Sequence, residues 1–298
     1  MGEPGSQALQ LNQIVVEVPR AQAGTAEAAL QGLGALSVTL RDAGDEPLLE
    51  PLPGEQPLWG RVRVEALIPA SVPSEAVGTA LGDTLGSPCP WAVFPVPERD
   101  WVRETQAAFP ARRFGRRLWV CPSWEEAPRE ATVLRLDPGL AFGTGAHPTT
   151  ALCLEWLDAH PPRGQQVVDY GCGSGILGIA AALLGASTVW ATDIDAQALE
   201  ATRSNAAHND LEPHRLQVVC PEALDGTSVS LVLANILQGP LLALQPTLTA
   251  LVAPGGTLVL SGLLRDQAEA VRMRYTPAFR FVAERTLDDW VLLEARRS

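Results

Sequence analysis

The sequence predicts a two-part α/β protein, in which a smaller α+β unit precedes a doubly wound domain with a mainly parallel sheet. Three observations lead to this fold class. Strands and helices follow the order β-α-β-β-α-β up to residue 97. From residue 134 onward, continuous Val- and Leu-rich strands alternate with helices, as in a parallel sheet that is covered on both faces. With 298 residues, of which 46% are hydrophobic, the chain is also long enough for two cores.

The first unit has the element order of a split βαβ, or ferredoxin-like, fold. Its six elements are expected at residues 11–18, 25–33, 36–42, 59–69, 73–85 and 91–97. Thr25 is the expected N-cap of the first helix. Val62 and Val64 alternate with charged residues, which predicts a strand with one buried face. The proline-rich stretch 45–57 is expected to be a loop.

The second unit follows a linker helix, which is expected over residues 98–112, so the predicted domains are 1–97 and 113–298. An aromatic, β-like segment opens the second domain. Later strands are expected at 133–137, 165–170, 187–193, 216–220, 229–235 and 256–262, and in a closing hairpin over 279–296. Helices between them are expected at 148–159, 175–184, 196–209, 240–252 and 265–275. This alternation indicates a parallel sheet between two layers of helices.

The composition excludes several classes of function. A net charge of −12 argues against a nucleic-acid-binding protein and favours a basic partner. The five cysteines are scattered without CxxC spacing, so neither a metal site nor a disulfide framework is expected. The chain contains no lysine, which excludes Schiff-base and P-loop chemistry. No apolar run reaches the roughly 18 residues of a membrane helix, and no signal peptide is visible, so we expect a cytoplasmic protein.

The segment Val167–Gly178, VVDYGCGSGILG, predicts a ligand site between a strand and a helix. Glycines such as Gly171 and Gly173 permit positive φ and let a ligand approach the backbone, and the helix start offers unpaired N–H groups. From Gly173 onward the segment also satisfies GxGxxG, and Asp193 lies 20 residues further on, as in dinucleotide sites. The alternatives are S-adenosylmethionine (SAM), a nicotinamide dinucleotide, and a turn without a ligand.

Three features favour SAM over a dinucleotide. Asp169 stands two residues before the first glycine, where its carboxylate can position the loop and reach the amino group of the methionine moiety. The corresponding residue is usually apolar in dinucleotide enzymes. The closing hairpin suits the antiparallel seventh strand of SAM-dependent enzymes, and no second nucleotide-binding half follows.

Two acidic residues follow the next predicted strand. Asp193 closes this strand at the ligand-side edge of the sheet, where its carboxylate could accept hydrogen bonds from both ribose hydroxyls. A capping role is the alternative for Asp193. Asp195, two residues later, is the expected N-cap of helix 196–209.

The segment Asp137–Leu157 combines a long glycine-bearing loop with the start of a helix. Pro148 suits an early helical position, because its missing N–H would be unpaired there anyway. The loop is either flexible or a lid over the cofactor, in which case Thr150 would hydrogen-bond to SAM. We interpret His147 as a capping or packing residue, and a general base is the less favoured alternative.

Asn235 ends the strand 229–235, beside the expected position of the transferred methyl group. Enzymes that methylate planar amide or ring nitrogens often carry (N/D)PP(Y/F) at this place, but the prolines and the aromatic residue are absent here. An aliphatic amine is therefore the favoured acceptor. Asn235 would orient this amine through its side-chain amide, although a strand-ending turn is the alternative role.

Four ordered motifs together resemble one known family. FGTGAHPTT, DYGCGSGILGIAA, TDID and LANILQGPL are similar to the bacterial ribosomal protein L-eleven (L11) methyltransferases, the PrmA family. Upstream, EPLPGEQPLWG, RDWVRE and RFGRRLWVCPSW extend the resemblance over nearly the whole chain. The stretch 104–114 is less aromatic than the family pattern, which affects details of domain orientation and leaves the chemistry unchanged.

The resemblance implies a Rossmann-like class I SAM-dependent methyltransferase domain with a seven-stranded sheet. It further implies a cytoplasmic protein-lysine methyltransferase with a mobile linker, whose first domain recognises L11. We expect the protein to be a monomer. The family's SAM contacts correspond to Thr150, Gly171, Asp193 and Asn235. SAM-dependent methylation of another protein, of RNA or of a small molecule remains an alternative, and a NAD-dependent oxidoreductase is the third class.

Overall fold

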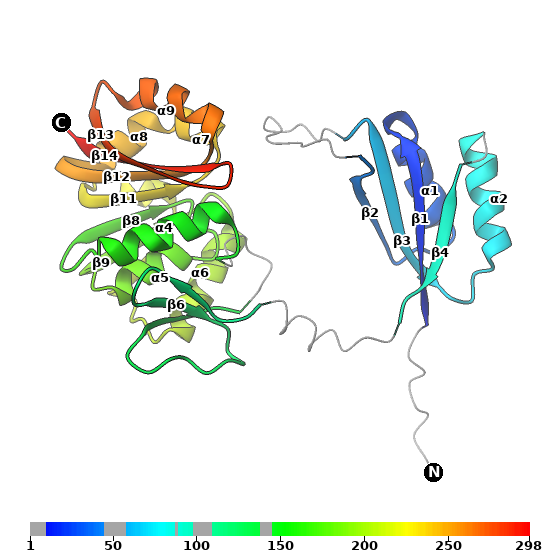
Figure 1. Cartoon of the computed structure of the whole chain (residues 1–298), viewed down its shortest axis with the longest axis horizontal. Helices are drawn as coiled ribbons and strands as arrows, with labels where there is room; N and C mark the ends of the chain where they lie inside the picture. The colour runs from blue at the N-terminus through cyan, green and yellow to red at the C-terminus, as the bar shows by residue number, and fades with distance from the viewer. Residues whose placement is uncertain (1–9, 45–57, 87–88, 98–108, 138–144) are drawn as a thin grey trace, which may run out of the picture. The chain divides into compact units, whose positions relative to one another are not determined.

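The structure is a computed structural model that describes residues 10–44, 58–86, 89–97, 109–137 and 145–298. The chain forms two compact units, Met1–Asp100 and Trp101–Ser298 (Figure 1). The expected loop at 45–57 lies outside the described residues. Within the described ranges, no helix is both long and apolar enough to cross a membrane.

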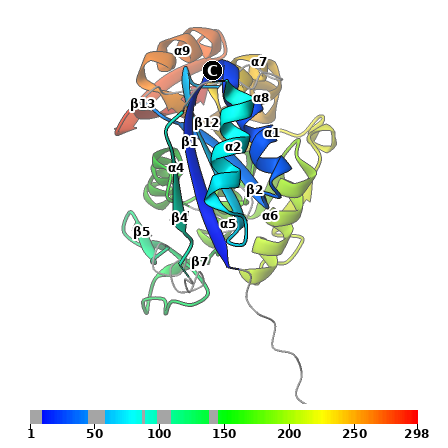
Figure 2. The same cartoon turned by 90° about the vertical axis from the view of Figure 1, so that its right-hand side faces the viewer.

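The first unit is a four-stranded sheet with two helices over one face (Figure 2). Its elements are β1 (Leu11–Pro19), α1 (Ala23–Gly32), β2 (Ser37–Asp42), β3 (Arg61–Pro69), α2 (Ser74–Leu85) and β4 (Trp91–Pro95). The strand order β2-β3-β1-β4, with antiparallel pairs throughout, confirms the ferredoxin-like prediction. Every second residue of β3 is buried, including Val62 and Val64, as its alternating sequence predicts.

The expected N-cap of the first helix is wrong. A 3-10 turn over Arg20–Gln22 leads directly into α1, so the helix begins at Ala23 and Thr25 already lies in its first turn. The N-cap residue is Gln22, and its side chain makes no capping hydrogen bond.

The second unit contains a seven-stranded sheet. Its strands are β8 (Gln166–Tyr170), β9 (Thr188–Thr192), β10 (Leu216–Val219), β11 (Val229–Asn235), β12 (Val252–Leu264), β13 (Phe279–Leu287) and β14 (Trp290–Arg297). They lie in the order β10-β9-β8-β11-β12-β14-β13. The strands from β10 to β12 pair in parallel, whereas β14 is antiparallel to both of its neighbours. The predicted antiparallel seventh strand is therefore confirmed.

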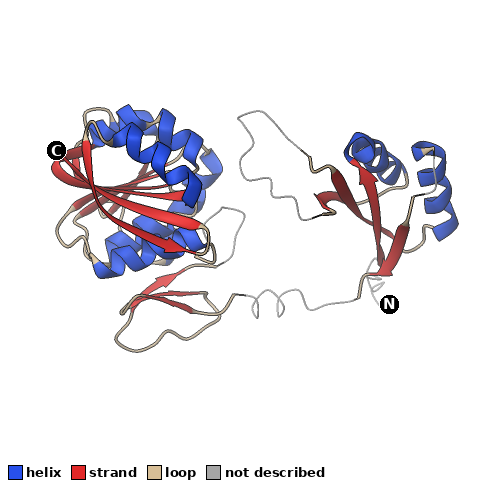
Figure 3. Cartoon of the chain, turned by 45° about the horizontal axis from the view of Figure 1, so that its top comes forward, coloured by secondary structure: helices blue, strands red, loops and turns tan. Residues whose placement is uncertain are grey.

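Helices cover both faces of this sheet, as the continuous apolar strands predict (Figure 3). The helices α4 (Pro148–Ala159), α5 (Ile176–Leu183) and α6 (Ala196–His208) pack on one face. The helices α7 (Gln238–Ala243), α8 (Gln245–Leu251) and α9 (Ala268–Tyr275) pack on the other. One helix was expected over 240–252, but Pro246 lies in the first turn of α8, and its ring and missing N–H separate α8 from α7.

A separate three-stranded sheet holds the segment before α4, which corrects the prediction that residues 133–137 join the main sheet. It contains β5 (Arg112–Phe114), β6 (Leu118–Cys121) and β7 (Thr132–Arg135). The side-chain amide of Asn209 occupies the free edge of β7, because its Oδ1 accepts a bond from Arg135 N at 2.7 Å and its Nδ2 donates to Arg135 O at 2.8 Å. β7 therefore meets β6 on one side and a side chain on the other.

Most of the predicted linker helix lies outside the described residues, and its described end is not helical. Phe109–Ala111 has no regular secondary structure, and Arg112 begins β5. Pro110 explains the difference at this end, since proline removes a backbone donor and disfavours helical geometry in the residue before it.

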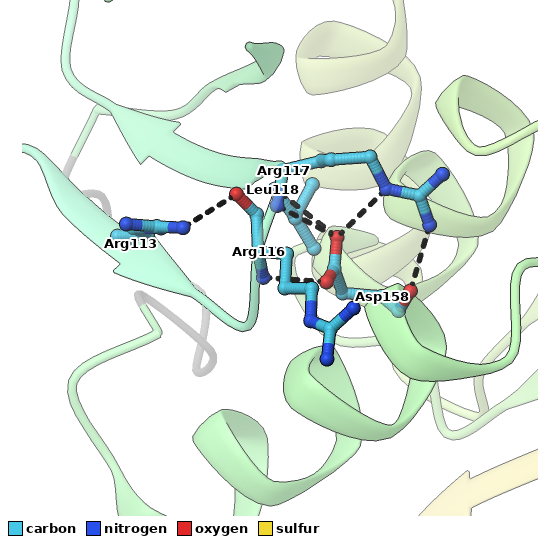
Figure 4. Close-up of polar contacts among 5 residues, drawn as sticks. All are labelled: Arg113, Arg116, Arg117, Leu118 and Asp158. Carbon is cyan, nitrogen blue, oxygen red and sulfur yellow. Dashed lines mark hydrogen bonds and ion pairs between the residues drawn. The ribbon is translucent and has the colours of Figure 1, made fainter.

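A buried carboxylate attaches the β5–β6 hairpin to the end of α4 (Figure 4). The Asp158 carboxylate accepts backbone hydrogen bonds from Arg116 at 2.6 Å, and from Arg117 and Leu118 at 3.1 Å each. Gly115 in the turn has φ +73°, and a Cβ there would lie 2.4 Å from Asp158 Oδ2, so only glycine fits. The other end of α4 carries residues of the functional site described below.

Candidate functional site

A cavity of about 550 Å³ lies at the carboxyl ends of the parallel strands. It is lined by His147, Thr149, Tyr170, Gly171, Gly173, Asp193, Ile194, Asn235, Ile236, Leu237, Pro240, Leu244, Gly262 and Trp290. The chain order reverses between β8 and β11, since β9 and β10 lie on one side and β12 on the other. Ligands of open α/β sheets bind at such a switch point. The cavity is therefore the first candidate for the functional site.

The glycines after β8 shape one wall of the cavity. Gly171, Gly173 and Gly175 have φ values of +76°, +55° and +79°, which disfavour other residues. A Cβ on Gly171 would lie 2.3 Å from the side chain of Ile236. A Cβ on Gly175 would lie 2.6 Å from that of Thr202. The φ values and these close neighbours therefore require glycine at positions 171 and 175, and Gly171 and Gly173 both line the cavity.

The buried side chain of Asp169 holds this loop in place. Its Oδ2 accepts a hydrogen bond from Gly178 N at 2.8 Å, which caps α5 in place of a side chain at Gly175. Burial raises the pKa of the Asp169 carboxyl to about 7, although the bond from Gly178 opposes that rise. The Asp169 carboxylate does not line the cavity. Its position supports the expected role of holding the glycine loop, but it does not support the expected contact with the amino group of SAM.

Asp193 and Asp195 take different positions. Asp193 lines the cavity, and its Oδ2 accepts a bond from Gly173 N at 3.0 Å while its Oδ1 accepts one from Asp195 N at 3.0 Å. Each carboxylate oxygen has a further lone pair for a ligand hydroxyl. Asp195 is the N-cap of α6, since its Oδ1 accepts a bond from Gln197 N at 2.8 Å, which confirms that prediction.

Asn235 lines the cavity, but Thr150 does not. Thr150 is 1% exposed, and its hydroxyl accepts a hydrogen bond from Asn235 Nδ2 at 3.3 Å. The structure therefore places Thr150 behind Asn235. This bond uses one of the two N–H groups of Nδ2, so the carbonyl Oδ1 and the second N–H of Asn235 remain for a ligand.

His147 is the N-cap of α4, as expected of a capping or packing residue. Its Nδ1 lies 2.8 Å from Thr149 Oγ1 and accepts a bond from Thr149 N at 3.4 Å. Burial lowers the pKa of the His147 imidazole. Its ring meets the indole of Trp290 edge to face, with centroids 4.6 Å apart and an interplanar angle of 70°.

The sequence interpretation missed two features of the cavity. Trp290 contributes from the start of β14, and Ile194 projects beside Asp193 with an exposed fraction of 92%. No motif contains Trp290, and only the turn of the closing hairpin could have pointed to it. The glycine-bearing part of the expected lid, residues 138–144, lies outside the described residues.

The chemistry of the lining fits SAM. The glycine loop admits a ligand to the backbone, Asp193 offers acceptors for hydroxyls, and Ile194 offers an apolar surface to a base. Within the described ranges, no group of three metal-ligating side chains occurs. The antiparallel β14 beside β12 takes the place at which a second nucleotide-binding half would extend a dinucleotide fold.

Comparisons with known proteins show the family of the chain. The family model described as "Ribosomal protein L11 methyltransferase (PrmA)" matches residues 10–298. A relative of that name from Pseudomonas aeruginosa strain LESB58 is 48% identical over 287 residues, which cover 96% of this chain and 98% of the relative. One from Hahella chejuensis is 47% identical over 286 residues, with the same two coverages.

A solved structure also matches the chain. The ribosomal protein L11 methylase from Lactobacillus delbrueckii subsp. bulgaricus has a TM-score of 0.59 and 32% sequence identity, and the match covers 64% of this chain and 100% of that chain. With the Rossmann-like sheet, the glycine loop and the family match in agreement, the chain belongs to the ribosomal protein L11 methyltransferase (PrmA) family.

Proposed function

We propose that this protein transfers methyl groups from SAM to lysine side-chain amines, and to the N-terminal amine, of ribosomal protein L11. The observation that carries the proposal is the convergence of Gly171, Gly173, Asp193 and Asn235 on one cavity at the switch point of the sheet. Membership of the family supports the substrate. The net charge of −12 also favours encounter with a basic protein.

Each cavity residue has a proposed role toward the cofactor. The Asp193 carboxylate would accept both ribose hydroxyls, beyond the two backbone bonds that it already accepts. Ile194, beside it, would pack against the adenine. Gly171 and Gly173 would admit the rest of the cofactor to the backbone. Thr150 would act on the cofactor site through Asn235, whose amide it orients.

When bound, SAM would supply an activated methyl group, so the task of the protein is to position an amine and to keep it neutral. A free lysine has a pKa of about 10.4, and deprotonation at pH 7 costs roughly 4–5 kcal/mol. An apolar cavity lowers this pKa, because it disfavours the charged form. Asn235 Oδ1 would accept an N–H of the neutral amine and direct its lone pair toward the methyl group.

A strong base is not needed in this mechanism. His147 is engaged as the N-cap of α4, and its lowered pKa keeps the imidazole neutral at pH 7. The proton that the amine must lose can leave to solvent before the amine enters the cavity. The first unit, at residues 1–97, would recognise L11, and the protein would act as a cytoplasmic monomer.

The proposal is tested with purified, unmethylated L11 and labelled SAM, followed by mass mapping of L11. The enzyme itself contains no lysine, so every methyl-lysine found belongs to the substrate. We expect label on L11 amines, and calorimetry should show binding of SAM but not of NAD. Unlabelled L11, or binding of NAD in place of SAM, would refute the proposal.

A further inference from the structure

An aromatic pair forms one end of the cavity. Trp290 begins β14, where it pairs with Leu264 of β12 and Leu287 of β13. Its indole meets the His147 ring at a centroid distance of 4.6 Å and an angle of 70°, and both side chains line the cavity. The capping bonds to Thr149 fix the orientation of the His147 ring, and this ring in turn packs against the indole of Trp290.

The strand order locates this pair relative to the other cavity residues. Along the edge, Asp193 follows β9, Gly171 follows β8, Asn235 ends β11, Gly262 lies on β12 and Trp290 begins β14. Neighbouring strands are about 4.8 Å apart, so Trp290 lies roughly 10 Å from β11, on the side away from Asp193. A cofactor whose ribose lies at Asp193 would extend toward Asn235, and Trp290 lies beyond that point.

The charges of the cavity separate its two ends. Among the described lining residues, Asp193 is the only carboxylate, and it lies at the ribose end. A carboxylate at the opposite end would hold the acceptor amine in its protonated form and oppose transfer. An aromatic face also attracts a cation, but more weakly than a full negative charge does, so it opposes loss of the proton less. The end formed by Trp290 and His147 therefore suits an amine that is neutral before methyl transfer and cationic after it.

We propose that Trp290 is the acceptor-binding residue of this site, whose indole face contacts the substrate amine and stabilises the positive charge that develops on it. The inference rests on the proposed function and extends it. The nitrogen lone pair forms a bond to the methyl carbon as the carbon–sulfur bond breaks, and that electron pair remains on sulfur as a neutral thioether. The positive charge thus passes to the methylated amine, which releases a proton to solvent before a further round.

The first test measures binding and needs no turnover. The probes are Nα-acetyl-Nε-trimethyllysine amide and its neutral isostere, in which carbon replaces the ammonium nitrogen. With S-adenosylhomocysteine present, the wild type should bind the cationic probe about fivefold to tenfold more tightly than the isostere. Trp290→Leu should abolish this difference, and Trp290→Phe should retain part of it. Equal binding of both probes by the wild type would overturn the inference.

The second test measures turnover on L11. Trp290→Leu should lower kcat about tenfold and reduce the fraction of trimethylated product, with unchanged calorimetric affinity for SAM. Trp290→Phe should restore most of this loss. Trp119→Leu makes the same exchange on β6, outside the cavity lining, and should leave both quantities unchanged. Trp290→Met replaces the leucine variant if that variant does not fold.

The outcomes separate the two proposals. If the wild type leaves L11 unmodified but discriminates between the probes, the proposed substrate is wrong and the role of Trp290 stands. If the wild type methylates L11 but Trp290→Leu keeps its kcat and product distribution, the role of Trp290 is wrong. Equal losses in the leucine and phenylalanine variants, together with a lower melting temperature, would show that Trp290 only packs against His147.

Discussion

Removal of the Asp193 carboxylate should weaken SAM binding by about two orders of magnitude. The two oxygens of Asp193 hold the backbone N–H groups of Gly173 and Asp195 and, in the proposed complex, also accept the two ribose hydroxyls. Hydrogen bonds to a charged acceptor contribute about 1.5–3 kcal/mol each. Asp193→Ala should therefore cost about 3 kcal/mol of binding free energy or more, which corresponds to an affinity on the order of 100-fold lower.

The neighbouring Asp195 provides a matched control. Asp195→Ala makes the same change in charge two residues away, but the side chain caps α6 through Gln197 N and does not line the cavity. This variant should lose about 1 kcal/mol of unfolding free energy, the usual contribution of an N-cap, and should bind SAM as the wild type does.

The assay is isothermal titration of both variants with SAM, beside urea unfolding of each. The reasoning is refuted if Asp193→Ala binds SAM with unchanged affinity. It is refuted equally if Asp195→Ala loses as much affinity as Asp193→Ala, because the effect would then come from general charge.

Three further predictions concern two cavity residues, Asn235 and Gly171, and the buried Asp169 beside the glycine loop. Asn235→Ala should lower kcat on L11 well beyond its effect on the calorimetric SAM affinity, and equal losses in both would count against an amine-orienting role. Gly171→Ala should abolish SAM binding, because the added Cβ would lie 2.3 Å from the side chain of Ile236. Gly226 is the control: its φ is also +76°, but a Cβ there would have no neighbour within 4 Å, so Gly226→Ala should bind SAM as the wild type does. Because the pKa of Asp169 is raised to about 7 in the folded state, the wild type should lose stability relative to Asp169→Asn as pH rises from about 4 to 7, by up to roughly 4 kcal/mol. Urea unfolding across that range tests the last point, and a constant difference between the two proteins would contradict it.

The local signals of the sequence predicted most of the fold. Alternation in β3, the proline at the start of α4 and the Asp195 cap each act within a few residues of their own position, so they can be interpreted without the tertiary structure. The same holds for the glycine loop, whose φ values and close neighbours require glycine. The antiparallel last strand followed from the single hairpin at the end of the chain.

Long-range contacts explain what the sequence did not predict. β7 pairs with β6 in the small sheet, and its other edge bonds to the side chain of Asn209, which lies 74 residues from Arg135 in the sequence. Thr150 on α4 contacts Asn235 at the end of β11, although 85 residues separate them in the sequence. Trp290 lies at the cavity because β14 lies beside β12 in the sheet. Such long-range contacts produce no pattern of hydrophobic or capping residues in the sequence around them, so they could not be predicted from it.

The central claim is that this cavity methylates amines of L11. Its most direct test is incubation of labelled SAM with the complete ribosomal proteins and RNA of a strain that lacks this methylation, followed by mass mapping. We predict label on L11 alone, at lysine side chains and the N-terminal amine, and its loss with Asp193→Ala. Label on RNA, on other ribosomal proteins or on no component would contradict the account.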